Sequence, residues 1–386
     1  MTELLYDPDR LAAALTEAGL DALVVTTAPN VRYLTRFGKP GTSLAVVGRD
    51  DPGRAHLLVS AGEIDYLVED LVPGLPLHVW GDFVRVDESA GPLDANQQLV
   101  AAAHRHRRPE LDRAAMLAAA AAELGLGSAQ IGLDVAPAAE PALAAALPNG
   151  IVTDASRLVR RLRSRKTDLE VTRIAEAARI AEAAISATKE TARAGATQAE
   201  LATEYRVAVA REGGLLRVDS VSVGVSTVFG NANVADAVLR TGDLLRFDVG
   251  AIFRGYQSDL SRCFSLGAPT VKAQRYAHAV IAGQSAALDM LRPGVRTTEL
   301  FTAAVEATRR AGIPHYDRTH VGHGIGLAGG YDAPLLAPGD PHTIEPGMVL
   351  CVETPYYEFG FGGVQIEDMV VVTDTGWRAL TRLPRT

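Results

Sequence analysis

Two acidic hairpins place the strongest constraint on what this chain can fold into. The stretch 242–259 predicts two short apolar strands joined by a turn near Arg254-Gly255, with Asp248 on one strand and Asp259 on the other. The midpoint between the aspartates falls near this turn, so we expect them to lie roughly opposite each other, with Cβ atoms about 4.5–5.5 Å apart. Carboxylates held this close repel each other unless a proton or a cation lies between them.

A second hairpin repeats the arrangement nearer the C-terminus. Glu353 and Glu367 flank a glycine-rich turn centred on Gly360. Two hairpins that each carry a pair of acidic residues predict a site for more than one metal ion.

The hairpins lie in what reads as an internal repeat. The segment 193–201 matches the segment 292–300, and each precedes a predicted helix. In each half a glycine stands six residues before the first acidic residue of the hairpin, Asp248 or Glu353. We therefore expect two equivalent halves, related by a two-fold repeat, that close four carboxylates around one cavity.

A histidine between glycines completes the predicted ligand set. His323 lies in Gly-His-Gly-Ile-Gly, where the glycines allow the backbone to approach a bound ion closely. A neutral imidazole is a common metal ligand. Carboxylate oxygens with one nitrogen favour manganese, iron or cobalt over a thiolate-type zinc site. Two such ions about 3.5–4 Å apart activate a water and polarise a carbonyl, which is hydrolytic chemistry.

The length of 386 residues favours two domains. Over residues 1–155, helical patterns alternate with short apolar runs, which predicts an α/β domain without a phosphate-binding or dinucleotide-binding loop. A linker is expected over 156–167, followed by an α+β catalytic domain over 168–386.

Composition limits the partners and the location. The net charge of −8 and the absence of a dominant basic stripe argue against nucleic acid as a partner. No apolar run approaches the ~18 residues of a membrane helix, and no signal peptide is evident, so we expect a cytoplasmic protein that binds no membrane. Cys263 and Cys351 lie in apolar runs, which indicates buried thiols in a reducing compartment.

The motifs resemble those of a known family. Asp248-Val-Gly with an aspartate eleven residues later, the Gly-His-Gly-Ile-Gly run and Gly-Gly-Val-Gln-Ile-Glu367-Asp occur in the order seen in the prolidase, aminopeptidase P and creatinase family. Residues 165–386 are similar to its pita-bread catalytic domain, and the N-terminal half resembles its non-catalytic α/β domain. The resemblance implies a site for two divalent ions, manganese first, with iron, cobalt and zinc as alternatives. Its ligands would be Asp248, Asp259, His323, Glu353 and Glu367.

Three positions near the implied site depart from the family pattern. Asn231 stands where family peptidases have a histidine beside the substrate, and Tyr331 or Gly330 stands where they have a second one. Gln365 replaces the family's arginine. Such groups steady a tetrahedral intermediate or transfer protons. Whether their loss abolishes peptidase activity stays open at this point, with His320, His315 and Tyr331 as candidates to compensate.

The resemblance implies a homodimeric hydrolase in which a metal-bound hydroxide attacks an amide and Glu353 accepts a proton. The expected substrate is an Xaa-Pro dipeptide or a short peptide with proline second, and Asn231, Gln365 and Arg36 are the expected substrate contacts. One alternative is a family member diverted to a small non-peptide amide or C–N compound, as creatinase was. A second alternative is a catalytically silent metal-binding homologue. Metal content separates the silent protein from the enzymes, and turnover separates the two enzymes.

Overall fold

The computed structural model describes residues 4–86, 91–147, 150–327 and 330–385. Two compact units make up the chain, Met1–Arg163 and Ser164–Thr386. Helix α6 lies in the segment that we expected to be a linker. None of the helices in these ranges is long and apolar enough to cross a membrane.

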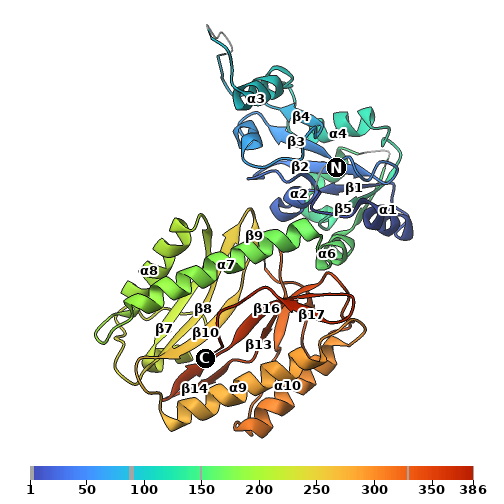
Figure 1. Ribbon diagram of the computed structural model, residues 1–386. Coiled ribbons are helices and arrows are strands. Elements are labelled where there is room, and N and C mark those ends of the chain that lie inside the picture. The colour runs from blue at the N-terminus through green and yellow to red at the C-terminus, as the bar shows by residue number, and fades with distance from the viewer. Residues whose placement is uncertain (1–3, 87–90, 148–149, 328–329, 386) are drawn as a thin grey trace. The chain divides into compact units, whose positions relative to one another are not determined.

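The N-terminal unit is an α/β domain around one mixed sheet (Figure 1). Its strands lie in the order β4-β3-β2-β1-β5-β6. The buried side chains of this unit include Val24, Val46 and Leu58 from the strands and Leu117 from helix α4, because the apolar face of the helix packs on the sheet. The elements are α1 (Pro8–Glu17), β1 (Ala22–Val25), α2 (Ala28–Thr35), β2 (Leu44–Gly48), β3 (His56–Ser60), η1 (Ile64–Val68), β4 (Leu77–Trp80), α3 (Ala95–Arg105), α4 (Arg113–Glu123), β5 (Gln130–Leu133), η2 (Pro137–Ala139), α5 (Pro141–Ala145), β6 (Ile151–Asp154) and α6 (Ser156–Ser164).

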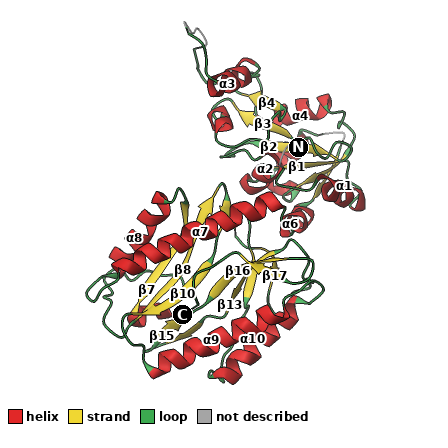
Figure 2. Ribbon diagram, viewed as in Figure 1, coloured by secondary structure: helices red, strands yellow, loops and turns green. Residues whose placement is uncertain are grey.

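The C-terminal unit is built on a nine-stranded sheet with two helix pairs (Figure 2). The sheet has the order β12-β11-β13-β16-β10-β8-β7, with β17 beside β16 and β9 beside β8. Helices α7 and α8 pack on the half that contains β7, β8 and β10, and helices α9 and α10 pack on the half that contains β13 and β16. The elements are α7 (Asp168–Thr191), α8 (Gln198–Arg211), β7 (Leu215–Val223), η3 (Gly224–Val228), β8 (Leu244–Phe253), β9 (Tyr256–Gln257), β10 (Leu260–Ser265), α9 (Val271–Met290), α10 (Thr297–Ala311), β11 (Gly322–Gly324), β12 (Asp332–Leu335), β13 (Val349–Glu353), β14 (Tyr356–Glu358), β15 (Gly362–Val364), β16 (Glu367–Val372) and β17 (Trp377–Ala379).

The two segments that read as a repeat precede helices α8 and α10, as expected. Each helix packs against its chain neighbour, α8 against α7 and α10 against α9. A symmetry that relates the two halves of the unit stays a prediction.

The first acidic hairpin has a register different from the one we expected. Asp248 pairs with Ser261, which places Asp259 opposite Gly250, two residues along the strand. The cause is the two-residue turn at Arg254-Gly255, where both residues have positive φ (46° and 86°), since such a turn fixes the register of the strands. A shift of two residues keeps both aspartates on the same face of the sheet.

The second acidic hairpin has the expected register. Glu353 pairs directly with Glu367 across β13 and β16. The residues between them form a small separate sheet of β14 and β15 with a turn at Gly360. Both hairpins belong to the large sheet, so their carboxylates meet near its centre.

The first turn of helix α7 contains a buried acidic residue, Glu170. Thr167 caps the helix by accepting from the Glu170 N–H, and the Glu170 carboxylate accepts from the Thr167 N–H at 2.8 Å, which is a capping box. The same carboxyl accepts from the Tyr256 hydroxyl at 3.0 Å. Burial raises the pKa of Glu170 to about 7, against the lowering effect of nearby Lys166.

The buried Glu170 is expected to make the stability of the protein pH-dependent. Between its ordinary pKa of 4.5 and its folded pKa of about 7, the folded protein binds a proton that the unfolded chain has lost. Stability therefore falls as the pH rises through this window, by about 3 kcal/mol in total. In Glu170→Gln the amide oxygen can accept from the Thr167 N–H and the NH2 group can donate to the Tyr256 hydroxyl oxygen, without a titratable group. The free energy of unfolding of this variant should therefore change less between pH 5 and pH 8 than that of the wild type.

Urea denaturation at four pH values measures the effect. Glu200→Gln is the matched control, because Glu200 makes the same capping box with Thr197 at the start of α8 but is exposed. Its unfolding free energy should follow the wild-type pH dependence. Equal pH dependence for Glu170→Gln and wild type would contradict the prediction.

Candidate metal centre

The five predicted metal ligands line one polar cavity of about 500 Å³ in the C-terminal unit. They come from five neighbouring strands of the large sheet or their ends. Four of them are buried, and Asp248 is half-buried. The ligands are Asp248 on β8, Asp259 just before β10, His323 on β11, Glu353 at the end of β13 and Glu367 at the start of β16.

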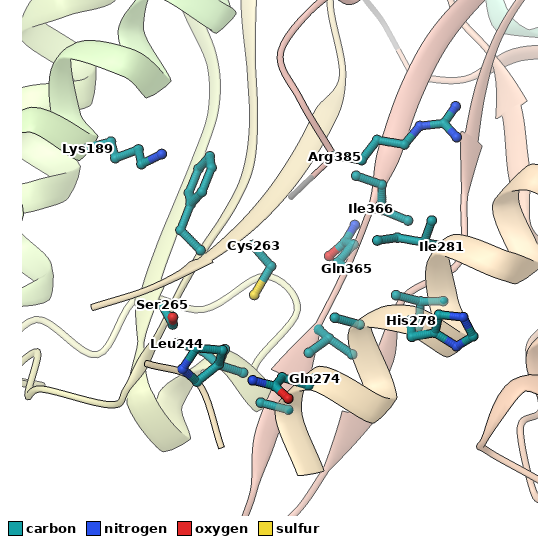
Figure 3. Close-up of a pocket in the computed structure, with 16 residues that line it drawn as sticks. Lys189, Leu244, Cys263, Ser265, Gln274, His278, Ile281, Gln365, Ile366 and Arg385 are labelled. Carbon is teal, nitrogen blue, oxygen red and sulfur yellow. The ribbon is translucent and has the colours of Figure 1, made fainter. Parts of the chain in front are cut away.

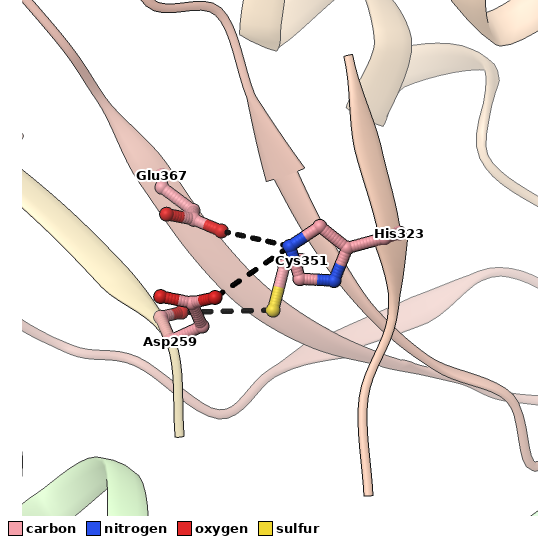
Figure 4. Close-up of side chains that lie close together, drawn as sticks. All are labelled: Asp259, His323, Cys351 and Glu367. Carbon is pink, nitrogen blue, oxygen red and sulfur yellow. Dashed lines mark hydrogen bonds and ion pairs between the residues drawn. The ribbon is translucent and has the colours of Figure 1, made fainter. Parts of the chain in front are cut away.

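Three of the predicted ligands and Cys351 form a close group of four side chains (Figure 4). Ligand atoms of Asp259, His323, Cys351 and Glu367 all lie within 4.8 Å of one another. His323 Nε2 is 3.6 Å from Asp259 Oδ2 and 3.7 Å from Glu367 Oε1. These distances are too long for hydrogen bonds but would suit side chains that share one cation, whose bonds to nitrogen and oxygen are about 2.0–2.2 Å long.

The orientation of His323 favours a cation over a proton in this space. Its Nδ1 lies 3.1 Å from the Gly324 carbonyl oxygen, which accepts a hydrogen bond from Nδ1–H and leaves the Nε2 lone pair facing the carboxylates. Burial lowers the pKa of His323 to about 4, so the imidazole is neutral near pH 7. A neutral nitrogen and two carboxylates that converge are all acceptors, and a divalent ion fits this donor set.

Cys351 lies in this group of four side chains, but its thiol is not suited to bind a metal ion. Its Sγ lies 3.6 Å from the Asp259 carbonyl oxygen, so the thiol donates to the backbone. Burial and nearby carboxylates raise the pKa of Cys351 well above its ordinary value. A thiol that stays protonated is a poor metal ligand, because the thiolate is the form that binds metal.

Asp248 and Glu353 occupy the other part of the cavity. Burial raises the pKa of Asp248 to about 6 and that of Glu353 to about 8, and Asp259 adds to both shifts. Burial and the other three carboxylates also raise the pKa of Glu367 well above its ordinary value. Four carboxyl groups with raised pKa values in one cavity require protons or cations for balance, which is the electrostatic condition for a metal site of this kind.

Three arginines at this site were missed by the sequence analysis. Arg246 Nη1 lies 3.2 Å from Asp248 Oδ2, and Arg217 Nη1 lies 2.8 Å from Asp259 Oδ1. Arg318 lines the cavity 4.0 Å from Glu353 Oε2. The alternation of Arg246 and Asp248 in an otherwise apolar strand was a usable signal, because residues i and i+2 share a face.

The positions that depart from the family pattern also lie at the cavity. Asn231 is exposed at its edge. Buried Gln365 accepts from Arg246 Nη1 at 2.6 Å and from the Tyr357 hydroxyl at 3.0 Å. Gln365, which lies between β15 and β16, is thus connected to β8 through the arginine.

Tyr331 and His320 flank His323 within the cavity, and Gly330 also lines it. The Tyr331 ring stacks on the His323 imidazole, with ring centroids 3.6 Å apart and an angle of 14° between planes. His320 Nδ1 lies 3.3 Å from Glu353 Oε1, and burial and Arg318 lower the pKa of His320 to about 4. Tyr331 therefore covers one side of the candidate ligand, and His320 faces the candidate proton acceptor.

Two other expected contacts are engaged elsewhere. Arg36 lies in the N-terminal unit, where its Nη2 pairs with Asp70 Oδ1 at 2.6 Å. His315 Nε2 lies 2.7 Å from the Tyr356 hydroxyl, and His315 does not line the cavity.

A second cavity in this unit, of about 570 Å³, is apolar (Figure 3). Cys263, Phe264, Ile281 and Ile366 contribute to its lining, and no aspartate or glutamate does. Burial raises the pKa of Cys263 to about 12, so its thiol is not a nucleophile near neutrality. The polar cavity is therefore the candidate site.

Comparison with known families gives two matches along the chain. Residues 9–165 match the creatinase/prolidase N-terminal domain, and residues 172–374 match metallopeptidase family M24. The chain is 29% identical over 226 residues to a putative dipeptidase, YkvY, of Bacillus subtilis, and 29% identical over 230 residues to an Xaa-Pro dipeptidase of Pyrococcus furiosus. These matches cover 57% and 59% of this chain and 61% and 66% of the relatives, so the chain spans less than two thirds of their length.

Solved structures resemble the chain over nearly its whole length. An Xaa-Pro dipeptidase from Bacillus anthracis has a TM-score of 0.78 and 25% identity, with 98% of both chains covered. The X-Pro aminopeptidase of Thermotoga maritima has the same TM-score and coverage at 23% identity, which shows the fold alone. The expected fold class, an α/β N-terminal domain followed by a pita-bread domain, is confirmed. Because the M24 match spans more than half of the chain, the protein belongs to metallopeptidase family M24.

Proposed function

We propose that the protein is a metal-dependent hydrolase that cleaves Xaa-Pro dipeptides and short peptides with proline second. The observation that carries the proposal is the convergence of four acidic side chains and His323 in one cavity. The names of the similar proteins, Xaa-Pro dipeptidase and putative dipeptidase, support the substrate class.

The same residues would hold two divalent ions, with manganese proposed first and iron, cobalt or zinc as alternatives. Asp259, His323 and Glu367 form the tighter group, and Asp248 and Glu353 complete the set. Bound ions of this kind polarise the amide carbonyl and lower the pKa of a water. We assign the ligand roles to these five residues as part of the proposal.

We assign proton transfer, shielding of His323 and substrate binding to side chains of this protein. Glu353 is the proposed proton acceptor, and His320 is the proposed neighbour of that acceptor, with its Nδ1 3.3 Å from Glu353 Oε1. Tyr331 shields His323 from water by stacking on it. Asn231 and Gln365 are the proposed substrate contacts, with Gln365 held in place by Arg246. Arg36 of the N-terminal unit remains a proposed contact to the substrate across a homodimer.

A specific observation favours a second candidate, a small non-peptide amide or C–N substrate. Among the described residues that line the cavity, His320 and His323 are the only imidazoles, and His323 is already assigned to metal. A peptide leaving group needs a proton, so a cavity with one imidazole left for proton transfer favours a substrate with an easier leaving group. A silent metal-binding homologue is the third reading.

Proline release decides among these readings. We expect chelator-sensitive turnover of an Xaa-Pro dipeptide and tripeptide panel in the presence of manganese. Protein that holds metal but releases no proline would exclude the peptidase and direct the search to non-peptide amides. Protein that binds no divalent ion would also exclude the second and third readings.

The proposed setting is a homodimer in the cytoplasm, with domain boundaries at residues 1–155 and 168–386. Size-exclusion chromatography with light scattering tests the dimer, and cell fractionation tests the location. A monomer that turns over substrate would remove Arg36 from the proposed contacts.

A further inference from the structure

Arg318 differs in its contacts from Arg217 and Arg246, the other two arginines near the candidate ligands. Arg217 makes an ion pair with Asp259 at 2.8 Å and donates a hydrogen bond to Gln257 at 2.6 Å. The Arg246 side chain is fully buried and hydrogen-bonded. Arg318 lies in the loop between α10 and β11, with a side chain that is 22% exposed. Its Nε is buried and has no hydrogen-bond partner among the described residues.

The nearest carboxylate does not satisfy this guanidinium. Arg318 Nη2 lies 4.0 Å from Glu353 Oε2, beyond hydrogen-bond distance. Glu353 is itself a proposed metal ligand, so part of its negative charge is directed to a cation. Removing a guanidinium from water costs free energy unless an anion is hydrogen-bonded to it. Among the described residues, no anion lies within hydrogen-bond distance of the Arg318 guanidinium.

A second nitrogen without a hydrogen-bond partner among the described residues lies next to Arg318. His320, two residues along the same loop, has a buried Nδ1 that faces Glu353 without hydrogen-bond geometry. Tyr357 forms the adjoining wall, with its ring centroid 6.0 Å from Arg318 Cζ. Two unsatisfied nitrogens and an aromatic wall thus lie beside the proposed proton acceptor.

We propose that Arg318 is a substrate-recognition residue that binds a carboxylate group located next to the scissile amide. The inference rests on the proposed function and narrows its substrate class to amides that carry a nearby carboxylate. A planar guanidinium binds a carboxylate through two parallel hydrogen bonds, which gives orientation as well as affinity. The carboxylate has two sources, the C-terminus of a dipeptide or an acidic side chain.

Two matched substrate pairs distinguish the sources. Ala-Pro and Ala-Pro amide differ in the C-terminal carboxylate, and Glu-Pro and Gln-Pro differ in the side-chain carboxylate. In the wild type, we expect the member with the recognised carboxylate to have a kcat/KM about 10–100-fold higher, the range for a charge-assisted hydrogen bond. The pair that shows the preference identifies the source.

In Arg318→Gln, this preference should fall to about threefold or less, chiefly through a higher KM, because a binding contact is made in both the ground state and the transition state. Arg318→Lys keeps the positive charge but lacks the two parallel N–H donors of the guanidinium. It should therefore restore part of the preference for the carboxylate-bearing substrate. Arg310→Gln is the control, since Arg310 is exposed on α10, pairs with Glu306 and should keep the wild-type preference. Equal loss on both members of each pair, or no preference in the wild type, would overturn the inference.

A binding measurement keeps the inference separate from the proposed function. Calorimetry of the metal-loaded protein with N-acetylproline and N-acetylprolinamide should show tighter binding of the acid, and Arg318→Gln should remove the difference. If the wild type cleaves no dipeptide, the proposed function fails while this measurement still tests Arg318. Equal affinity for the acid and the amide would exclude the subsite even in an active peptidase.

Discussion

Replacing Glu367 with glutamine is expected to abolish stoichiometric divalent-ion binding and to lower kcat/KM by at least about 10³-fold, because a bound ion supplies several kcal/mol of transition-state stabilisation. Glu367 is buried at the start of β16, and its Oε1 lies 3.7 Å from His323 Nε2. Glutamine keeps the volume of the side chain but removes the charge. Metal content after dialysis, measured by mass spectrometry, and proline release test the two effects.

The same substitution should have opposite effects on stability with and without metal. In chelator, burial and the carboxyls of Asp259, Glu353 and Asp248 raise the pKa of Glu367 well above its ordinary value, so an ionised Glu367 is unfavourable in the folded protein. The neutral glutamine removes this unfavourable contribution and should raise Tm. With manganese, the wild type gains stability from binding that the variant lacks, so the wild type should melt at the higher temperature. A packing defect would lower the Tm of the variant both in chelator and with manganese. The reversed order of the two Tm values therefore indicates an effect of charge and metal binding.

Glu345→Gln is the matched control for Glu367→Gln. Glu345 stands in a Glu-Pro-Gly turn that resembles a ligand motif, but its side chain is 50% exposed and lies 3.5 Å from Arg165. It does not line the cavity. This variant should keep full metal content and activity. Retention of stoichiometric metal by Glu367→Gln would contradict the ligand assignment.

The positions of the acidic residues could be predicted because short-range rules govern them. In a strand, residues alternate between faces, so the spacing around Gly360 was enough to pair Glu353 with Glu367. The first hairpin was predicted with a register wrong by two residues. Its turn at Arg254-Gly255 sets the pairing, and the midpoint of the two aspartates does not.

The surroundings of the acidic residues depend on features that spacing does not encode. Arg217 lies where the register of β7 shifts between Leu216 and Val218, and such a bulge redirects a side chain without a clear sequence signal. Arg318 reaches the cavity from a loop whose path is set by tertiary packing.

The contacts of Arg246 explain why a charged residue alternates with Asp248 in an otherwise apolar strand. Its side chain is fully buried beneath the cavity. Nη1 donates to Gln365 Oε1 at 2.6 Å and lies 3.2 Å from Asp248 Oδ2, while Nη2 donates to the carbonyls of Phe229 (2.7 Å) and Gly230 (3.3 Å). One guanidinium therefore connects a proposed ligand, a proposed substrate contact and the backbone just before Asn231.

We expect Arg246→Met to lower the free energy of unfolding by about 3–5 kcal/mol, the usual cost of removing one partner from a buried ion pair. Methionine fills similar space but removes the Arg246 donor from the Asp248 carboxylate and from the Phe229 carbonyl oxygen, while the Gly230 carbonyl oxygen keeps Ser220 Oγ as a donor. Urea denaturation in chelator measures the loss without a contribution from metal. Arg246→Met combined with Asp248→Asn should recover part of the stability, because the second substitution removes the uncompensated charge.

The partial recovery separates an electrostatic role of Arg246 from simple packing. If the arginine served only to fill space, the two substitutions would add, and the double variant would be the least stable of the set. Arg246→Lys provides the intermediate case, since lysine keeps the charge but cannot reach Gln365 and the two carbonyls at once. It should therefore retain the pairing with Asp248 and lose the alignment of Gln365. That loss would appear as reduced turnover in a protein more stable than Arg246→Met.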